Sequence, residues 1–121
     1  MAEAIKSYRD LIAWQKAYSL GKALYALAGK PPDHERFGLI SSIRRMSVGI
    51  ASDIAQGYGR GNTSDYIYFL KKARGDIYSL DTQLLFAVDF RYLTDDDYAV
   101  AKSQLDEAER VLAGLIRSLG G

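Results

Sequence analysis

Apolar residues recur every three or four positions along most of this chain, and this spacing constrains the fold more than any other feature. It is the spacing of one face of an α-helix, which takes about 3.6 residues per turn. The alternation typical of half-buried strands is missing from the sequence. The sequence therefore predicts an all-helical fold. The longest run shows the spacing without interruption, at Tyr66, Leu70, Ala73, Ile77, Leu80, Leu84 and Ala87.

Four such runs follow one another, separated by residues that end or begin helices. Pro31 and Pro32 stop the first run, because proline lacks a backbone N–H and restricts the residue before it. The glycines between 57 and 61 interrupt the chain after the second run, and Thr94 is a typical N-cap for the fourth. We expect helices at roughly residues 8–28, 36–58, 64–92 and 95–119.

Short connections between long helices make neighbouring helices antiparallel. The prediction is an all-α fold, an antiparallel up-down-up-down four-helix bundle, forming a single domain over residues 1–121. A chain of this length buries enough surface to hold a core without staples. The core stripe expected for the first helix is Leu11, Trp14, Tyr18, Gly21, Tyr25 and Ala28.

Composition narrows the classes of protein to which the chain can belong. It has no cysteine, which excludes disulfides, thiolate metal sites and thiol nucleophiles. No run approaches the ~18 apolar residues of a membrane span, and the N-terminus lacks the apolar stretch of a signal peptide. We therefore expect a cytoplasmic protein without a membrane partner.

Charge is distributed unevenly along the chain. The net charge is +1, but residues 1–62 hold nine Lys or Arg against five Asp or Glu, and residues 63–121 hold seven against ten. A near-neutral total argues against a dedicated nucleic-acid-binding domain, whose pI is usually above about 9. The asymmetry suits copies that dock head to tail, with a basic surface against an acidic one.

Two features of the apolar residues point to close contacts. The second run contains many small residues, so we expect its helix to be wedged tightly between its neighbours. There is also more apolar surface than one seam requires. This predicts homo-oligomerisation, since aromatic residues outside a core tend to lie at interfaces, and broad core stripes are the alternative explanation. The surplus residues are Leu20, Leu24, Leu27, Tyr68, Tyr78, Phe86, Phe90, Val111 and Ile116.

Catalytic and metal chemistry finds little support in the sequence. The single histidine, His34, lies in a proline-rich loop without ligands at metal spacing. Carboxylates such as Asp76, Asp81 and Glu109 are expected at the surface or in ion pairs. Asp53 lies among apolar residues and needs a partner, such as Arg44, Arg45 or a helix terminus. We expect no enzyme activity, no metal and no cofactor.

Anion and nucleic-acid contacts are the remaining candidates. The glycine-rich segment 57–61 lacks both the preceding strand and the Gly-Lys-Ser/Thr ending of a phosphate-binding loop. An anion site built from Arg60 and the amides after Asn62 stays open as an alternative. Six basic residues are expected to cluster at the adjoining ends of the second and third helices, where they could contact phosphates: Arg44, Arg45, Arg60, Lys71, Lys72 and Arg74.

Several segments together resemble one bacterial family. These are Leu11-x-x-Trp14-x-x-Ala17, Glu35-x-x-Gly38-Leu39, the stretch from Ile43 to Gly57, Phe69-Leu70-x-x-Ala73-Arg74-Gly75 and Leu93-Thr94. They are similar to the four-helix-bundle proteins first noted as open reading frames in intervening sequences of large-subunit ribosomal RNA genes. The resemblance covers nearly the whole chain, and the segment from Ile43 to Gly57 is its most specific part.

This resemblance implies a cytosolic homopentamer without an assigned enzyme activity. A related branch, the accessory variability proteins of diversity-generating retroelements, implies association with a reverse transcriptase and nucleic acid, and motivates the same hypothesis for Arg44, Arg45 and Arg74. The family commonly shows Asn-Ile-Ala-Glu-Gly where this chain has Asp53-Ile54-Ala55-Gln56-Gly57. The exchange suggests a polar contact between Asp53 and Gln56.

Two functions follow from different classes of protein. The first is a homo-oligomeric scaffold or adaptor that offers a basic surface to RNA or to an enzyme acting on nucleic acid. The alternative is a bundle that binds a small molecule or anion in a groove between helices or subunits, near Asp53 and Arg45.

Overall fold

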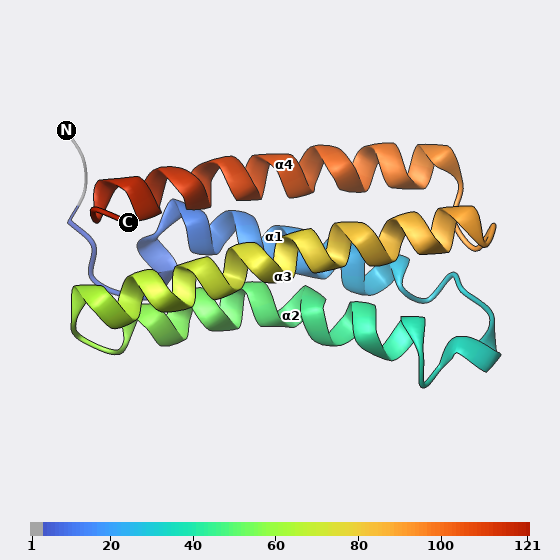
Figure 1. Cartoon of the computed structure of the whole chain (residues 1–121), viewed down its shortest axis with the longest axis horizontal. Coiled ribbons are helices and arrows are strands. Elements are labelled where there is room, and N and C mark those ends of the chain that lie inside the picture. Colours follow the sequence, from blue (N-terminus) through green and yellow to red (C-terminus); the bar gives the residue numbers. More distant parts are fainter. Residues whose placement is uncertain (1–3) are drawn as a thin grey trace.

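The computed structural model describes residues 4–121, and the first three residues of the predicted 1–121 domain lie outside this range. Four helices run up and down in alternation (Figure 1). They are α1 (Ile12–Leu27), α2 (Leu39–Tyr58), α3 (Thr63–Asp89) and α4 (Asp95–Ser118). No strand occurs between residues 4 and 121. The predicted all-α, antiparallel four-helix bundle is confirmed.

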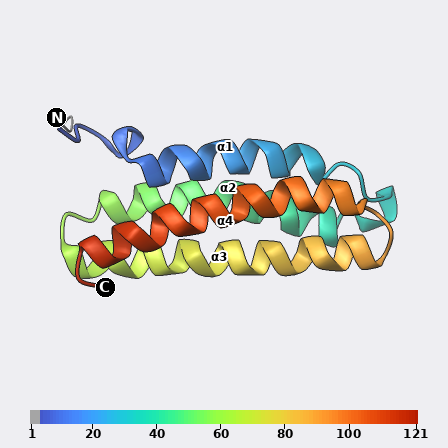
Figure 2. The ribbon, with the colours of Figure 1, turned by 90° about the horizontal axis from the view of Figure 1, so that it is seen from above.

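The helices stand at the corners of a square in the order of the chain. Each packs against the next, and α4 closes the arrangement against α1, whereas the backbones of the diagonal pairs α1–α3 and α2–α4 do not come close together. Two views at right angles show this placement (Figures 1 and 2). As a result α1 lies between α2 and α4, a relation that matters for assembly below.

The predicted starts of the first two helices are too early. Residues 8–10 form a separate 3-10 helix, and Leu11 is extended with ψ 125°, so α1 begins at Ile12. Residues 33–35 form another 3-10 helix, and Gly38 lies outside the helical region at φ −108° and ψ −109°, so α2 begins at Leu39. Periodicity continues through both breaks, because a 3-10 turn also presents residues three apart on one side.

The caps that begin the later helices follow the expected chemistry. The carboxamide oxygen of Asn62 accepts a hydrogen bond from the Asp65 N–H at 2.8 Å. The Thr94 hydroxyl accepts one from the Asp97 N–H at 3.0 Å, and the Asp97 carboxylate accepts one from the Thr94 N–H. Such pairs satisfy N–H groups that have no partner within the helix. At the other end α3 stops at Asp89, three residues before its predicted end.

Leucine, isoleucine and alanine side chains from all four helices fill one core. Fully burying a leucine or isoleucine contributes about 1.5–3 kcal/mol. Three of the residues predicted as surplus apolar surface, Leu20, Leu24 and Ile116, belong to this core with exposed fractions of 3% or less. The largest buried side chains are Leu20, Leu24, Ile43, Ile50, Ile54, Leu70, Leu80, Leu84, Leu105 and Leu112.

Helix α2 approaches both of its neighbours closely. A Cβ added at Gly21 of α1 would overlap the carbonyl oxygen of Ser47, and one added at Gly57 would lie 2.7 Å from the Cβ of Phe69 on α3. The Ser47 hydroxyl is buried and donates to the Ile43 carbonyl at 2.6 Å. The small residues of α2 thus serve the tight packing that the sequence predicts.

Among residues 4–121, none of the helices combines the length and the apolar character that crossing a bilayer requires.

Candidate functional site

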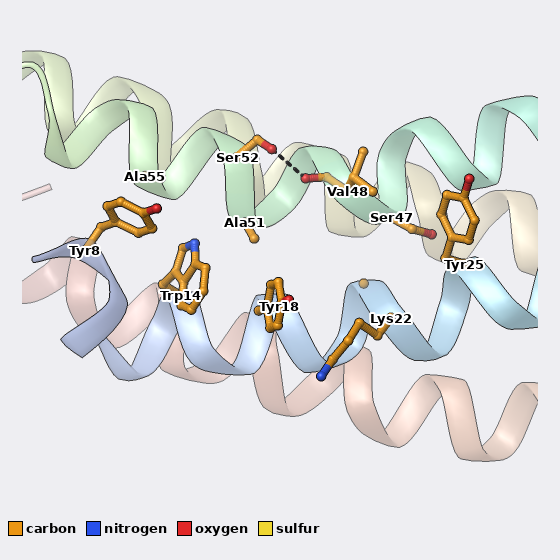
Figure 3. Close-up of a pocket in the computed structure, with 11 residues that line it drawn as sticks. Tyr8, Trp14, Tyr18, Lys22, Tyr25, Ser47, Val48, Ala51, Ser52 and Ala55 are labelled. Carbon is orange, nitrogen blue, oxygen red and sulfur yellow. Dashed lines mark hydrogen bonds between the residues drawn. The ribbon is translucent and has the colours of Figure 1, made fainter.

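A groove of about 490 Å³ runs between α1 and α2 on the outside of the bundle. Its floor consists of small residues, among them Gly21, Ala51 and Ala55. Aromatic side chains from the N-terminal 3-10 helix and from α1 form its wall, as the close-up shows (Figure 3). The groove is therefore apolar, open to solvent, and lined by two helices.

The aromatic wall is a continuous row of ring contacts. The centroids of Tyr8 and Trp14 are 5.3 Å apart in an edge-to-face arrangement, and Trp14 stacks on Tyr18 at 4.8 Å with an interplanar angle of 15°. The Lys22 ammonium lies 4.8 Å from the centre of the Tyr18 ring. Each contact fixes the position of its neighbour, so the row is preorganised.

A second cation lies at the far end of the groove. The guanidinium of Arg44 on α2 lies 4.9 Å from the centre of the Tyr25 ring on α1. Tyr18 and Tyr25 are nevertheless 48% and 46% exposed, and Val48 on the opposite rim is 53% exposed. Large apolar side chains left in this state on neighbouring helices typically mark an interaction surface.

The row corrects the stripe predicted for the first helix. Trp14, Tyr18 and Tyr25 were expected in the core, but they face the groove instead. Helix α1 carries two apolar stripes side by side, and spacing alone does not tell which one points inward. The residues of α1 that fill the core are Ala13, Ala17, Leu20 and Leu24, with Gly21 at the boundary of both stripes.

Both helices that line the groove lack exposed acidic residues. Helix α1 contains Lys16 and Lys22 and no Asp or Glu, and α2 contains Arg44, Arg45 and a single acid, Asp53. Asp53 is 5% exposed and pairs with a lysine of α3, so its charge faces away from the groove. The groove is consequently basic as well as aromatic.

The six basic candidates do not form one patch. Arg44 and Arg45 lie in the second turn of α2, whereas Arg60 follows its C-terminal end. At 1.5 Å per residue, the intervening helix separates them by roughly 20 Å. The expectation that all six gather at the adjoining helix ends is therefore wrong, because it neglected the rise of the helix.

The three candidates on α3 point in different directions. Lys72 is engaged by Asp53, with Nζ and Oδ1 3.0 Å apart. Lys71 is exposed, and Arg74 is half-buried beside Tyr78 on the side of α4. Arg60 stacks on the Phe69 ring at 4.9 Å. Arg45 and Lys71 are thus the candidates whose charges are most available to an external partner.

Asp53 receives the partner that its burial requires, but a different one from those predicted. The carboxylate pairs with Lys72 of α3 rather than with Arg44 or Arg45. Gln56 is exposed. The structure brings Asp53 together with Asp76 across the α2–α3 seam rather than with Gln56.

The Asp53 carboxylate at this seam changes the proton affinity of Asp76. Burial and the neighbouring Asp53 carboxylate together raise the pKa of Asp76 to about 7, while Lys72 opposes the increase. Two acids this close hold one proton more readily than two negative charges. Among the described side chains, Asp53 Oδ2 is buried without a hydrogen-bond partner, and a proton on Asp76 would supply one.

The other sequence candidates are occupied in ways that concern the fold. Nε2 of His34 lies 3.3 Å from the Tyr92 hydroxyl, which in turn donates to Glu35 at 3.0 Å. Of the amides after Asn62, that of Asp65 donates to the Asn62 side chain itself. Within residues 4–121, no three His, Asp or Glu side chains lie close enough together to hold a metal ion.

These features define a class: a helical bundle whose most developed surface is an open aromatic groove. The chain belongs to the 23S rRNA-intervening sequence protein family, whose sequence model matches residues 9–114. The match covers most of the groove and most of the core, and it confirms the family resemblance of the sequence motifs. No curated protein matches the chain.

Proposed function

We propose that this protein is a non-enzymatic scaffold built from identical copies, five of them as the family resemblance implies, and that it works in the cytoplasm. The observation that carries the proposal is the uncovered groove of about 490 Å³ between α1 and α2, with its row of half-exposed aromatic rings. Aromatic side chains are enriched at protein interfaces and contribute strongly to binding. A monomer in water leaves this surface without a partner.

Assembly state tests the scaffold directly. Light scattering coupled to size exclusion should give a mass about five times the 13.4 kDa of the chain at micromolar concentration. The mass should persist at high salt, because burial of apolar surface depends little on screening. A 13.4 kDa particle under these conditions would contradict the proposal.

RNA, or an enzyme that acts on nucleic acid, is the partner we propose for the basic surface of the scaffold. Arg45 and Lys71 are exposed, and both can reach phosphates without breaking an internal ion pair. A ring of copies would repeat these charges around its circumference, so many weak phosphate contacts would act together. The modest net charge of each chain is compatible with this arrangement.

Removing both charges should weaken RNA binding. In an electrophoretic shift with a structured RNA, Arg45→Ala with Lys71→Ala should lower affinity at ~50 mM salt and flatten the dependence of log affinity on log salt, by about one for each lost contact per chain. Lys16→Ala is the matched control, because Lys16 is exposed but pairs with Glu107 at 2.7 Å. An unmodified protein that fails to shift RNA at ~50 mM salt would remove RNA from the proposal.

The alternative of a small-molecule or anion site near Asp53 and Arg45 has less support. The Asp53 carboxylate is buried and held by Lys72 at the α2–α3 seam, whereas Arg45 is exposed. These two groups do not face a common cavity among those described. A screen of metabolites by thermal shift addresses this alternative, since bound ligand raises the melting temperature.

A further inference from the structure

Helix α4 of the same molecule carries a surface that is complementary to the groove between α1 and α2. Helix α4 carries six acidic residues and three basic ones, which gives it a charge of −3, while α1 and α2 together hold four cations and the buried Asp53. Residues 96, 100, 103 and 107 of α4 share one face by their spacing. The Glu107 side chain pairs with Lys16, so this face lies on the α1 side of α4.

The exposed part of this face has the shape and charge to enter the groove. Val100 is 64% exposed, and Asp96 and Ser103 on either side of it are exposed as well. A ridge with one apolar residue between small and acidic ones fits a groove with a small-residue floor and two cations, Lys22 and Arg44, toward one end. We call Asp96, Val100 and Ser103 the α4 ridge.

We propose that the groove between α1 and α2 receives the α4 ridge of a second copy of this chain, and that repetition of this contact closes a ring. This inference rests on the proposed scaffold function and specifies its interface. A contact between unlike surfaces generates either a ring or an open filament. The choice depends on the angle between the two surfaces.

The position of α1 decides in favour of a ring. Helix α1 packs against both α2 and α4, so the groove and the α4 ridge lie on neighbouring sides of the bundle rather than on opposite sides. Figure 2 shows α1 along one edge of the molecule, with α2 and α4 next to it. Each added copy is therefore turned relative to the previous one, and the chain of contacts bends back on itself.

The groove and the α4 ridge also lie at the same height along the bundle axis. Lys16 pairs with Glu107 and Lys30 pairs with Asp97, which aligns α1 with α4 inside one copy. Lys22 lies between the two lysines, and Ser103 lies between the two acids. In a ring whose axis runs parallel to the helices, neighbouring copies differ only by rotation about that axis. Lys22 of one copy therefore lies at the same height as Ser103 of the next.

Other occupants fit this groove less well. A two-fold contact of groove against groove would bring Lys22 and Arg44 of both copies together without acids to neutralise them. Stacked RNA bases need free ring faces, but Trp14 and Tyr18 cover each other, and Lys22 and Arg44 lie over the rings of Tyr18 and Tyr25. The rings present edges and apolar rims, which suits a helix.

Cross-linking tests the interface without background, because the chain has no cysteine. The variant Lys22→Cys with Ser103→Cys, treated with a short thiol-to-thiol cross-linker, should give a ladder of covalent oligomers on a denaturing gel. A mixture of the two single variants should give covalent dimers, and Lys22→Cys alone should give none. Lys22→Cys with Thr82→Cys is the control, since Thr82 is exposed on α3 away from the ridge.

Substitutions that block either the groove or the α4 ridge provide a second test. Val48→Lys blocks the groove and Val100→Lys blocks the ridge, and both positions are more than half exposed, so the helical circular dichroism should not change. Each variant alone should be monomeric, with association weakened at least about a hundredfold, because an ammonium group would lose its water in an interface that already holds Lys22 and Arg44. An equimolar mixture should form dimers and nothing larger, since only one productive interface remains.

The outcomes separate this inference from the function on which it rests. A monomeric unmodified chain overturns both. An oligomeric chain that cross-links through Lys22→Cys alone, or through Thr82→Cys and not Ser103→Cys, keeps the scaffold and overturns the groove-and-ridge interface. Assembly of Val48→Lys and Val100→Lys as efficient as that of the unmodified chain overturns it as well.

Discussion

Gly21→Ala should lower the free energy of unfolding by about 1–3 kcal/mol, although alanine is the better helix former. The new Cβ would overlap the Ser47 carbonyl oxygen, and a backbone atom cannot move aside without shifting α2 against α1. Urea denaturation followed by circular dichroism measures the change. Because Gly21 also lines the groove, the variant should assemble less well at equal helix content.

The same substitution at Gly75 is the matched control. Gly75 lies inside α3, is exposed, and would place its Cβ in open space. Gly75→Ala should therefore raise the free energy of unfolding by up to about 1 kcal/mol, the difference in helix propensity. Opposite signs for the two substitutions would show that helix contact, rather than helix propensity, governs Gly21. Equal signs would contradict the close approach of α1 and α2.

Asp76→Asn should remove a pH-dependent loss of stability. In the folded protein burial and the neighbouring Asp53 carboxylate raise the pKa of Asp76 from 3.8 to about 7. The folded state therefore holds a proton that the unfolded state releases between about pH 4 and 7. The stabilisation from this proton is complete below about pH 4 and is lost as the pH rises through 7.

The asparagine variant should lose this dependence. Its amide can donate to Asp53 Oδ2, which has no other partner in the described part of the chain, and no second negative charge forms at high pH. Relative to the unmodified protein, Asp76→Asn should be more stable at pH 8 by about 1 kcal/mol, a value reduced for the partial exposure of the site. At pH 4 the two proteins should differ little.

Urea unfolding at pH 4 and pH 8 measures the difference. Asp89→Asn is the control, because Asp89 is an exposed carboxylate on the same helix, remote from Asp53. That variant should keep the pH dependence of the unmodified protein. If Asp76→Asn also keeps it, the proton is not shared at the α2–α3 seam, and the pairing of these two acids has no effect on stability.

Helix number, order and direction were accessible from the sequence because they depend on local physics. Apolar spacing, the prolines at 31 and 32, and the caps at Asn62 and Thr94 act within a few residues. Family membership was accessible as well, from motifs spread along the chain. The boundaries at Leu11 and Gly38 were not, because a short 3-10 helix continues the same spacing.

The candidate site shows where local reasoning stops. Trp14, Tyr18 and Tyr25 obey the spacing of a core stripe, yet they line a groove, because the inward face of α1 is chosen by its contacts with α2 and α4. A second stripe of equal periodicity, running from Ala13 to Leu24, was the available signal. Likewise, Asp53 was known to need a partner, but its choice of Lys72 depends on how α2 and α3 are aligned.

The sequence by itself determined four amphipathic helices, their turns and caps, an excess of apolar side chains, and opposite charge in the two halves of the chain. Only the tertiary structure decided which apolar side chains remain outside, which acids share a proton, and that the basic groove and the acidic ridge lie on neighbouring sides. The physical reason is that periodicity fixes which residues share a helix face, whereas the direction of that face is set by packing between helices distant in sequence.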